Sequence, residues 1–266
     1  AFSPVPRSKR TSGWVDDISL VYPHYFGDEK ALQQMAEIVP ANKILVMNWG
    51  FLDGFNRRVP EYRLPPTGTV NDSLVAAVKK TRDMGFRTGI YTSLALVDRD
   101  THPTIMEEYG LDFYYNAPSE KKPAATVSEE ERKKNWLVYV HPGSSTWHEY
   151  YAGRMAEVHR VYGIDYLYQD VTGCATGSAG IIDGRTFNEG VIACEKEIRR
   201  RVPDAALGGE YWNIVNAVEE DFGIISLLAW GGAGHAAEIS RPHNPHPILS
   251  YLFSDYCVLW PHGVAI

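Results

Sequence analysis

Apolar runs of strand length alternate with amphipathic helical patterns along the chain. The runs expected to form strands are 14–21, 44–49, 87–92, 136–141, 164–170, 205–210, 224–230 and 256–260. The main helical patterns cover 28–39, 71–84, 144–162 and 186–202. Strands that alternate with helices in this way are typical of a parallel sheet. About eight such strands in about 250 residues predict an α/β protein, a (β/α)8 TIM barrel.

Most of the 266 residues are expected to form this one barrel domain. Residues 1–13 have the composition of a linker, and 14–266 would form the barrel. A charged stretch near 116–135 lacks strand character, which predicts an excursion from the barrel. The alternative is an open doubly wound sheet. Such a sheet usually carries a glycine-rich phosphate loop after its first strand, and the segment Tyr22-Pro23-His24 is not one.

The run 136–141 leaves the strand count open. If it is a barrel strand, Asp170 ends the fifth strand and the barrel is complete. If it pairs outside the barrel with 111–116, Asp170 ends the fourth strand and the barrel is incompletely closed at its C-terminal end. In both cases the strands that end in Asp170 and Glu210 are neighbours.

Two carboxylates occupy equivalent positions at the ends of neighbouring apolar runs. Asp170 ends one run and Glu210 ends the next, with a helical pattern between them. Both acids should therefore lie at the same edge of a parallel sheet. Neighbouring strands lie about 4.8 Å apart. Retaining glycosidases hold their carboxyl groups about 5–5.5 Å apart, against about 6.5–9.5 Å in inverting enzymes. The pattern favours a retaining glycosidase.

Strand alternation predicts the face on which the two acids lie. Asp170 shares its side of the strand with Tyr166 and Tyr168, and Glu210 shares its side with Gly208. A barrel interior accommodates small residues on one strand beside bulky residues on the next. Both acids are therefore expected to point toward the axis at the C-terminal mouth, where barrel enzymes carry out their chemistry.

Other strand ends carry polar or aromatic residues at the positions where a barrel enzyme binds substrate. The candidate substrate-binding residues are Asn48, Trp49, Asp53, Tyr91, His141, Gln169, Trp212 and Trp230. The chain has 16 Tyr and 7 Trp, and sugar-binding clefts use flat aromatic faces of this kind. The expected partner is a carbohydrate: an oligosaccharide, a polysaccharide or a glycoconjugate.

Composition excludes several other classes of function. The net charge of −7 argues against a nucleic-acid partner, and no apolar stretch approaches the roughly 20 residues that span a bilayer. Cys174, Cys194 and Cys257 form no CxxC motif, and the loop histidines His243 and His246 have no third ligand nearby, so no metal site and no cofactor are predicted. The compartment stays open, with a secreted or cell-envelope location slightly favoured.

Several motifs resemble those of barrel glycoside hydrolases close to the endo-alpha-N-acetylgalactosaminidase family. The matching blocks lie between Leu45 and His262: Asn48-Trp49, 60–68, 84–91, Val140-His141-Pro142 with Trp147, 162–170 and 209–212. The resemblance implies that Asp170 is the nucleophile and Glu210 the acid/base. Alpha-amylase-like and alpha-galactosidase-like barrels place a nucleophilic Asp in a comparable position. The resemblance to the endo-alpha-N-acetylgalactosaminidase family also implies flanking β-sandwich domains in a longer protein, and none is expected within these 266 residues.

Two other functions compete with hydrolysis. A non-catalytic carbohydrate-binding barrel would use the same aromatic residues. A sugar-active lyase or aldolase of the Schiff-base class needs a lysine within a strand. None of the expected strands contains one.

Overall fold

The structure is a computed structural model that describes residues 13–51, 57–102, 104–105, 113–114, 121–122, 128, 130, 137–170, 172, 180–210, 219–225 and 257–261. The expected linker, apart from Gly13, and most of the expected excursion near 116–135 lie outside these residues.

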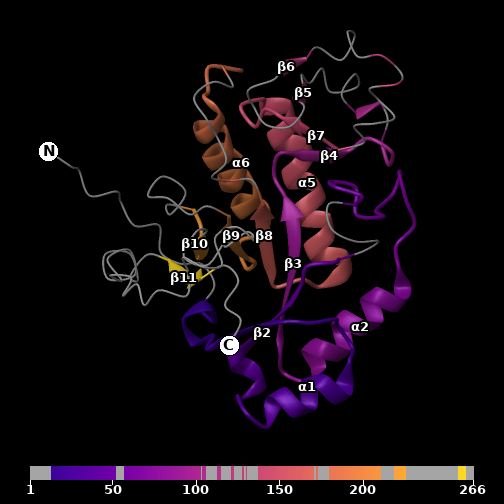
Figure 1. Ribbon diagram of the computed structural model, residues 1–266, viewed down its shortest axis with the longest axis vertical. Helices are drawn as coiled ribbons and strands as arrows, with labels where there is room; N and C mark the ends of the chain where they lie inside the picture. The colour runs from indigo at the N-terminus through magenta and orange to yellow at the C-terminus, as the bar shows by residue number, and fades with distance from the viewer. Residues whose placement is uncertain are drawn as a thin grey trace, which may run out of the picture.

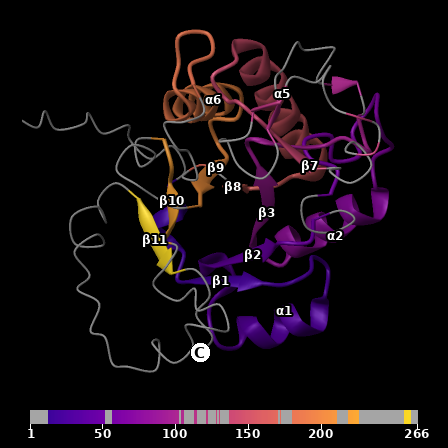
Figure 2. The ribbon, with the colours of Figure 1, turned by 45° about the horizontal axis from the view of Figure 1, so that its top comes forward.

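Seven parallel strands form the main sheet, in the order β1-β2-β3-β8-β9-β10-β11 (Figure 1 and, with β1 labelled, Figure 2). Their bounds are β1 Leu20–Pro23, β2 Ile44–Asn48, β3 Arg87–Ser93, β8 Tyr166–Asp170, β9 Ala206–Gly209, β10 Phe222–Ile225 and β11 Val258–Pro261. The expected α/β architecture with a parallel sheet is confirmed. Within the part of the chain that the structure describes, β1 and β11 are the two edges of an open sheet.

The helices lie along the outside of this sheet, as Figure 2 shows. They are α1 (Glu29–Ala36), α2 (Asp72–Asp83), α5 (Ser145–Tyr162) and α6 (Phe187–Arg201), with short 3-10 helices η1 (Val15–Asp17) and η2 (Ala41–Lys43). None of the described helices combines the length and the apolar character needed to cross a membrane.

Helix boundaries follow the capping residues in the sequence. The Asn71 side chain accepts a hydrogen bond from the Leu74 amide at 3.1 Å and begins α2. Gly163 follows α5 with φ of 73°, a left-handed conformation that favours glycine. Thr186 and Glu189 form a capping box at the start of α6.

The segment expected to be the first strand has a different structure. Residues 15–17 form η1, and β1 begins only at Leu20. Val15 and Ile18 are buried in the cluster on the concave face of the main sheet. The apolar positions in this segment therefore reflect burial against the inside of the sheet, and not pairing along its edge.

A second, antiparallel sheet settles the strand count. Its order is β4 (Leu96–Asp98), β7 (Leu137–Val140), β5 (Phe113–Tyr114) and β6 (Lys121–Lys122). The run 136–141 thus pairs with the short strand at 113–114, outside the main sheet. Asp170 consequently ends the fourth strand of the main sheet.

Apolar residues form one layer on each face of the main sheet. Leu167 and Leu207 belong to the larger layer, which also includes buried residues of the helices. Tyr166, Tyr168 and Ala206 belong to the smaller layer on the concave face. Val21 of β1 and Val258 of β11 pack against this same smaller layer, although they come from opposite edges. The sheet is therefore curled, as in a barrel fragment.

Candidate active site

Asp170 and Glu210 lie side by side at the C-terminal edge of the main sheet. Gln169 of β8 pairs with Gly209 of β9, so the next residue on each strand carries an acid at the same level. The Glu210 amide donates a hydrogen bond to the Gln169 carbonyl at 3.2 Å, and this bond keeps the ends of the two strands in register. Both acidic residues are half-buried.

The Asp170 side chain lies on the concave face. Its Oδ2 accepts a hydrogen bond from the hydroxyl of Tyr91, a residue of the concave layer. Burial, followed by the charge of Asp170, raises the pKa of Tyr91, so this phenol stays protonated and remains a donor. The side chain of Asp170 therefore points to the concave face of the sheet, as strand alternation predicts.

The charge of Glu210 affects the pKa of the same two tyrosines as the charge of Asp170. Burial is the main cause of the raised pKa of Tyr168, and the charges of Asp170 and then Glu210 add to it. The same two carboxylates also raise the pKa of Tyr91. Two phenols of one patch on the concave face thus lie within electrostatic reach of both acids.

Three aromatic rings form that patch. Trp49 follows β2 and lies edge-on to Tyr168, with ring centroids 5.0 Å apart. Tyr91 completes the group at 5.9 Å from Trp49 and 5.8 Å from Tyr168. Tyr91 and Tyr168 are almost fully buried, whereas Trp49 is half-buried. Trp49 is therefore the ring with most surface left to meet a ligand.

Glycines allow β9 to approach its neighbours closely. A Cβ at position 208 would overlap the Tyr166 hydroxyl and the Phe222 carbonyl. The Thr172 hydroxyl donates a hydrogen bond to the carbonyl oxygen of Glu210 at 2.8 Å. Small residues on β9 beside bulky residues on β8 match the packing expected of a barrel interior.

The remaining substrate-binding candidates that the structure describes do not lie at this patch. Gln169 is fully buried on the other side of β8, where its side-chain oxygen accepts a hydrogen bond from Tyr151 of α5 at 2.5 Å. Asn48 is buried and shares its side of β2 with Val46, in the layer beneath the helices. Asp53, Trp212 and Trp230 lie outside the described residues.

His141 directly follows a strand, but that strand is β7 of the second sheet. The imidazole is buried, and its Nε2 lies 3.3 Å from the Gly180 carbonyl. Its ring meets Phe187 of α6 edge-on at 5.5 Å. The expectation that His141 lies at the mouth of a barrel strand therefore needs correction, because β7 pairs antiparallel with β4 and β5.

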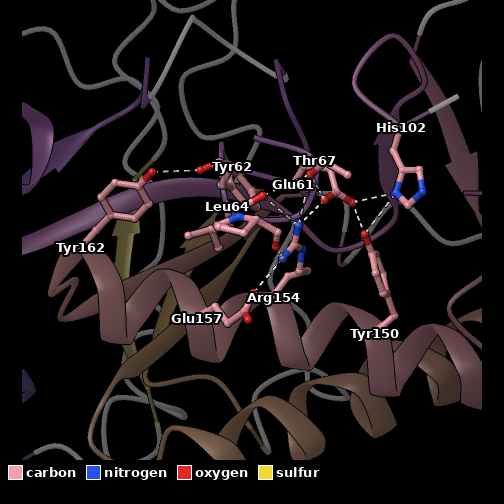
Figure 3. A network of polar contacts seen from close by, with 10 residues as sticks. Glu61, Tyr62, Leu64, Thr67, His102, Tyr150, Arg154, Glu157 and Tyr162 are labelled. Atoms are coloured by element: carbon pink, nitrogen blue, oxygen red, sulfur yellow. Dashed lines mark hydrogen bonds and ion pairs between the residues drawn. The ribbon is translucent and has the colours of Figure 1, made fainter. Parts of the chain in front are cut away.

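A buried ionic network holds the loop after β2 against α5 (Figure 3). Glu61 is fully buried and pairs with Arg154, while Thr67 and Tyr150 donate hydrogen bonds to its carboxylate. His102 Nδ1 lies 3.1 Å from the same group. Burial would raise the pKa of Glu61, but these hydrogen bonds and the Arg154 charge outweigh it and lower the pKa. The 60–68 block therefore contains a structural anchor.

Several residues of this region were not among the sequence candidates. Tyr168 completes the aromatic patch, and its shared parity with Asp170 was the available signal. Glu195 and Glu220 are buried acids behind β9, and nothing in their local sequence distinguishes them from surface acids. Among the described residues, no three His, Cys, Asp or Glu side chains are grouped to hold a metal ion. His243 and His246 lie outside that part of the chain.

Comparison with known proteins gives matches among solved structures only. No family model and no curated protein matches the sequence. A variant of the GH36 alpha-galactosidase AgaA from Geobacillus stearothermophilus, in complex with raffinose, is similar with a TM-score of 0.51 and 13% identity, over 77% of this chain and 30% of that chain. The alpha-galactosidase AgaB from the same organism gives 0.50 and 12%, with the same coverage. The chain thus spans 30% of the length of either enzyme. At this identity the likeness establishes the fold alone: an α/β barrel-like fragment of the kind found in GH36 alpha-galactosidases.

Proposed function

We propose that the chain is the catalytic part of a retaining glycoside hydrolase that cleaves an alpha-linked glycosidic bond. The observation that carries this proposal is the register of β8 and β9, which sets Asp170 and Glu210 side by side at the C-terminal edge of a curled parallel sheet. Strand spacing of about 4.8 Å is compatible with the carboxyl separation of about 5–5.5 Å in retaining enzymes. The neighbouring structures are named as alpha-galactosidases, one of them holding raffinose, which supports a carbohydrate ligand.

The proposed reaction uses only the two carboxyl groups. Glu210, neutral at the start, gives its proton to the glycosidic oxygen as the bond from that oxygen to the anomeric carbon breaks. An Asp170 oxygen bonds to the anomeric carbon and forms a glycosyl-enzyme. Glu210 then takes a proton from water, whose oxygen displaces Asp170 and releases the sugar. No cofactor takes part, and the Tyr91 hydroxyl would orient the Asp170 carboxylate.

We also propose an architecture for the parts of the protein outside the described residues, and a substrate class. We expect the curled sheet to belong to a (β/α)8 barrel, with β-sandwich domains beside it in a longer protein. The motif resemblance favours an endo-alpha-N-acetylgalactosaminidase-like enzyme that acts on a glycoconjugate or polysaccharide.

The test is hydrolysis of a panel of aryl glycosides of both anomers, with the product anomer identified by proton NMR. Retention of configuration supports the mechanism, and inversion contradicts it. Asp170→Ala should abolish turnover even of activated substrates. Glu210→Ala should slow substrates with poor leaving groups far more than activated ones. Asp83→Ala, which removes a largely exposed acid of α2, is the matched control and should keep the wild-type rate.

A non-catalytic carbohydrate-binding domain is the second candidate, because the patch around Trp49 would serve binding equally well. Calorimetry with oligosaccharides separates the two functions. Sugar binding that is unchanged in Asp170→Ala, with no turnover of any aryl glycoside by the wild type, would favour the binding domain. A Schiff-base lyase is disfavoured because none of the strands that the structure describes in the main sheet contains a lysine.

A further inference from the structure

Two carboxyl groups are buried together behind the strand that carries Glu210. Glu195 lies on α6 and is fully buried, and Glu220 precedes β10 with 3% of its surface exposed. Their carboxyl oxygens have no hydrogen-bond partner of normal geometry, and neither residue forms an ion pair in the described part of the chain. An ionised carboxylate is very unfavourable in such a place. The pair is therefore expected to hold at least one proton.

The charged groups around the pair do not neutralise it. Those nearby are Lys196 and Arg199 on α6, Glu219 and Asp221 before β10, and the titratable side chains of Cys194 and Tyr166. Arg199 donates to the Asp221 carboxylate at 2.9 Å. Lys196 Nζ lies 4.0 Å from a Glu219 oxygen. Both cations thus face other acids.

Gly209 brings Glu220 into contact with the backbone next to Glu210. A Cβ at position 209 would overlap both Glu220 Oε1 and Thr172 Oγ1, so these two oxygens lie against the same face of Gly209. The Thr172 hydroxyl has one hydrogen, which it donates to the Glu210 carbonyl at 2.8 Å. Its lone pairs can therefore only accept. A protonated Glu220 carboxyl beside those lone pairs has a hydrogen to offer them, whereas an ionised carboxylate has none.

We infer that Glu220 in its neutral form is a positioning residue for Glu210, acting through Thr172 to hold the backbone that carries Glu210 to the edge of the sheet. Burial raises the pKa of Glu220 to about 8 and also raises that of Glu195, where the Glu220 charge adds to the effect. The support is therefore present at neutral pH and is lost at alkaline pH. The catalytic meaning of this device rests on the proposed function, but the link between the three residues does not.

Carboxyl-carbon NMR of protein labelled at glutamate tests the link without a substrate. The Glu220 resonance, assigned from Glu220→Gln, should titrate near pH 8, and the Glu210 resonance, assigned from Glu210→Gln, should show a second inflection at the same pH. In Glu220→Gln that second inflection should disappear. In Glu219→Gln, a charge-matched control at the adjacent position, it should persist.

Thr172 variants distinguish a specific link from general loosening. Thr172→Val removes the hydroxyl at almost constant volume and should abolish the response of Glu210 while Glu220 still titrates. Thr172→Ser restores the hydroxyl and should restore the response. A Glu210 resonance that ignores the titration of Glu220 in the wild type, or that keeps its second inflection in Thr172→Val, would overturn the inference.

Activity provides a separate arm of the test. If the wild type hydrolyses an aryl glycoside, Glu220→Gln should keep kcat above pH 8, where the wild type loses about tenfold for poor leaving groups. KM should change little, because Glu220 does not meet the ligand. If no aryl glycoside is hydrolysed, the proposed function fails while the NMR result still decides the link. If Glu220→Gln loses kcat in parallel with the wild type, the positioning role is wrong even in an active enzyme.

Discussion

The hydroxyl of Tyr91 donates a hydrogen bond to Oδ2 of Asp170. Tyr91 lies on β3 and Asp170 ends β8, and the two strands are neighbours in the main sheet. The contact engages Oδ2 of Asp170 and thereby fixes the orientation of the carboxylate, including its other oxygen. A hydrogen bond to an ionised group stabilises by about 1.5–3 kcal/mol, more than a neutral one. Tyr91 thus has a supporting role toward the proposed nucleophile that its sequence position alone does not indicate.

Replacement of this phenol should reduce the rate at which the glycosyl-enzyme forms. Tyr91→Phe keeps the ring against Trp49 but removes the donor, so we expect kcat to fall by about 10-fold or more, since each 1.4 kcal/mol is a factor of ten. Rapid-quench measurement of the first turnover of an activated aryl glycoside checks this. Tyr168→Phe is the control, because its hydroxyl makes no hydrogen bond to Asp170 in the structure. Equal losses in the two variants would refute a specific role for Tyr91.

The half-buried Trp49 should contribute mainly to binding. Trp49→Ala removes the ring that packs on Tyr91 and Tyr168, and we expect KM for an aryl glycoside to rise about tenfold with a smaller change in kcat. Trp49→Phe keeps a flat apolar face and should recover most of the affinity. Steady-state kinetics of the two variants measure this difference. An unchanged KM in Trp49→Ala would show that the ligand lies elsewhere.

The buried acids predict a loss of stability as the pH rises. Burial raises the pKa of Glu220 in the folded state to about 8. At a pH between the pKa of the unfolded state and this value, unfolding therefore releases a proton. The stabilising contribution is complete at acid pH and is lost as the pH rises through 8. Each unit of difference corresponds to about 1.4 kcal/mol. The free energy of unfolding should therefore fall by several kcal/mol between pH 5 and pH 8.

Urea unfolding at several pH values tests this dependence. Glu220→Gln should flatten the decline, because the amide has no proton to release in this range. Glu149→Gln, at an exposed position of α5, should leave the decline as it is in the wild type. The same slope in all three proteins would mean that Glu220 is ionised in the folded state.

The buried pair between Glu61 and Arg154 should be sensitive to the loss of one partner. Arg154→Ala leaves the Glu61 carboxylate buried without its cation, and we expect a loss of about 3–5 kcal/mol in the free energy of unfolding. Because the folded-state pKa of Glu61 is lowered, its contribution is present at neutral pH and is lost as the pH falls through that pKa. Chemical unfolding at pH 7 and pH 4 measures both effects.

The double variant Glu61→Met with Arg154→Leu provides the check on this interpretation. Replacing both charges by apolar groups of similar size leaves no unpaired ion, so its loss should be smaller than the sum of the single losses. Additive losses would show that the two residues act independently. The exposed pair of Lys79 and Asp83 on α2 is the control, for which removal of one partner should cost less than about 1 kcal/mol.

Local sequence signals predicted most of the elements. The helical patterns 71–84, 144–162 and 186–202 place α2, α5 and α6 to within about two residues, because the boundaries depend on residues close in sequence, such as the cap Asn71 and the stop at Gly163. The parity of Asp170 with Tyr168 correctly assigned the acid to the concave face, because alternation is a property of the strand itself.

Assignments that depend on partners distant in sequence were less successful. The run 136–141 has the composition of a strand in either sheet, and only its pairing with β4 and β5 excludes it from the main one. Gln169 lies beside Asp170 in sequence but on the other face, where Tyr151 of α5 binds it. His141 directly follows a strand, yet it packs against Phe187 in another part of the fold.

The sequence by itself determined the alternation of strands and helices, the face on which Asp170 lies and the fact that Glu210 follows it at the end of the next parallel strand. Those features arise from periodicity and from short-range hydrogen bonding. The tertiary structure alone decided that Tyr91 supports Asp170 and that two buried acids lie behind Gly209. The physical reason is that hydrogen bonds, burial and pKa depend on which distant side chains are brought together, and the chain encodes those contacts only through the complete fold.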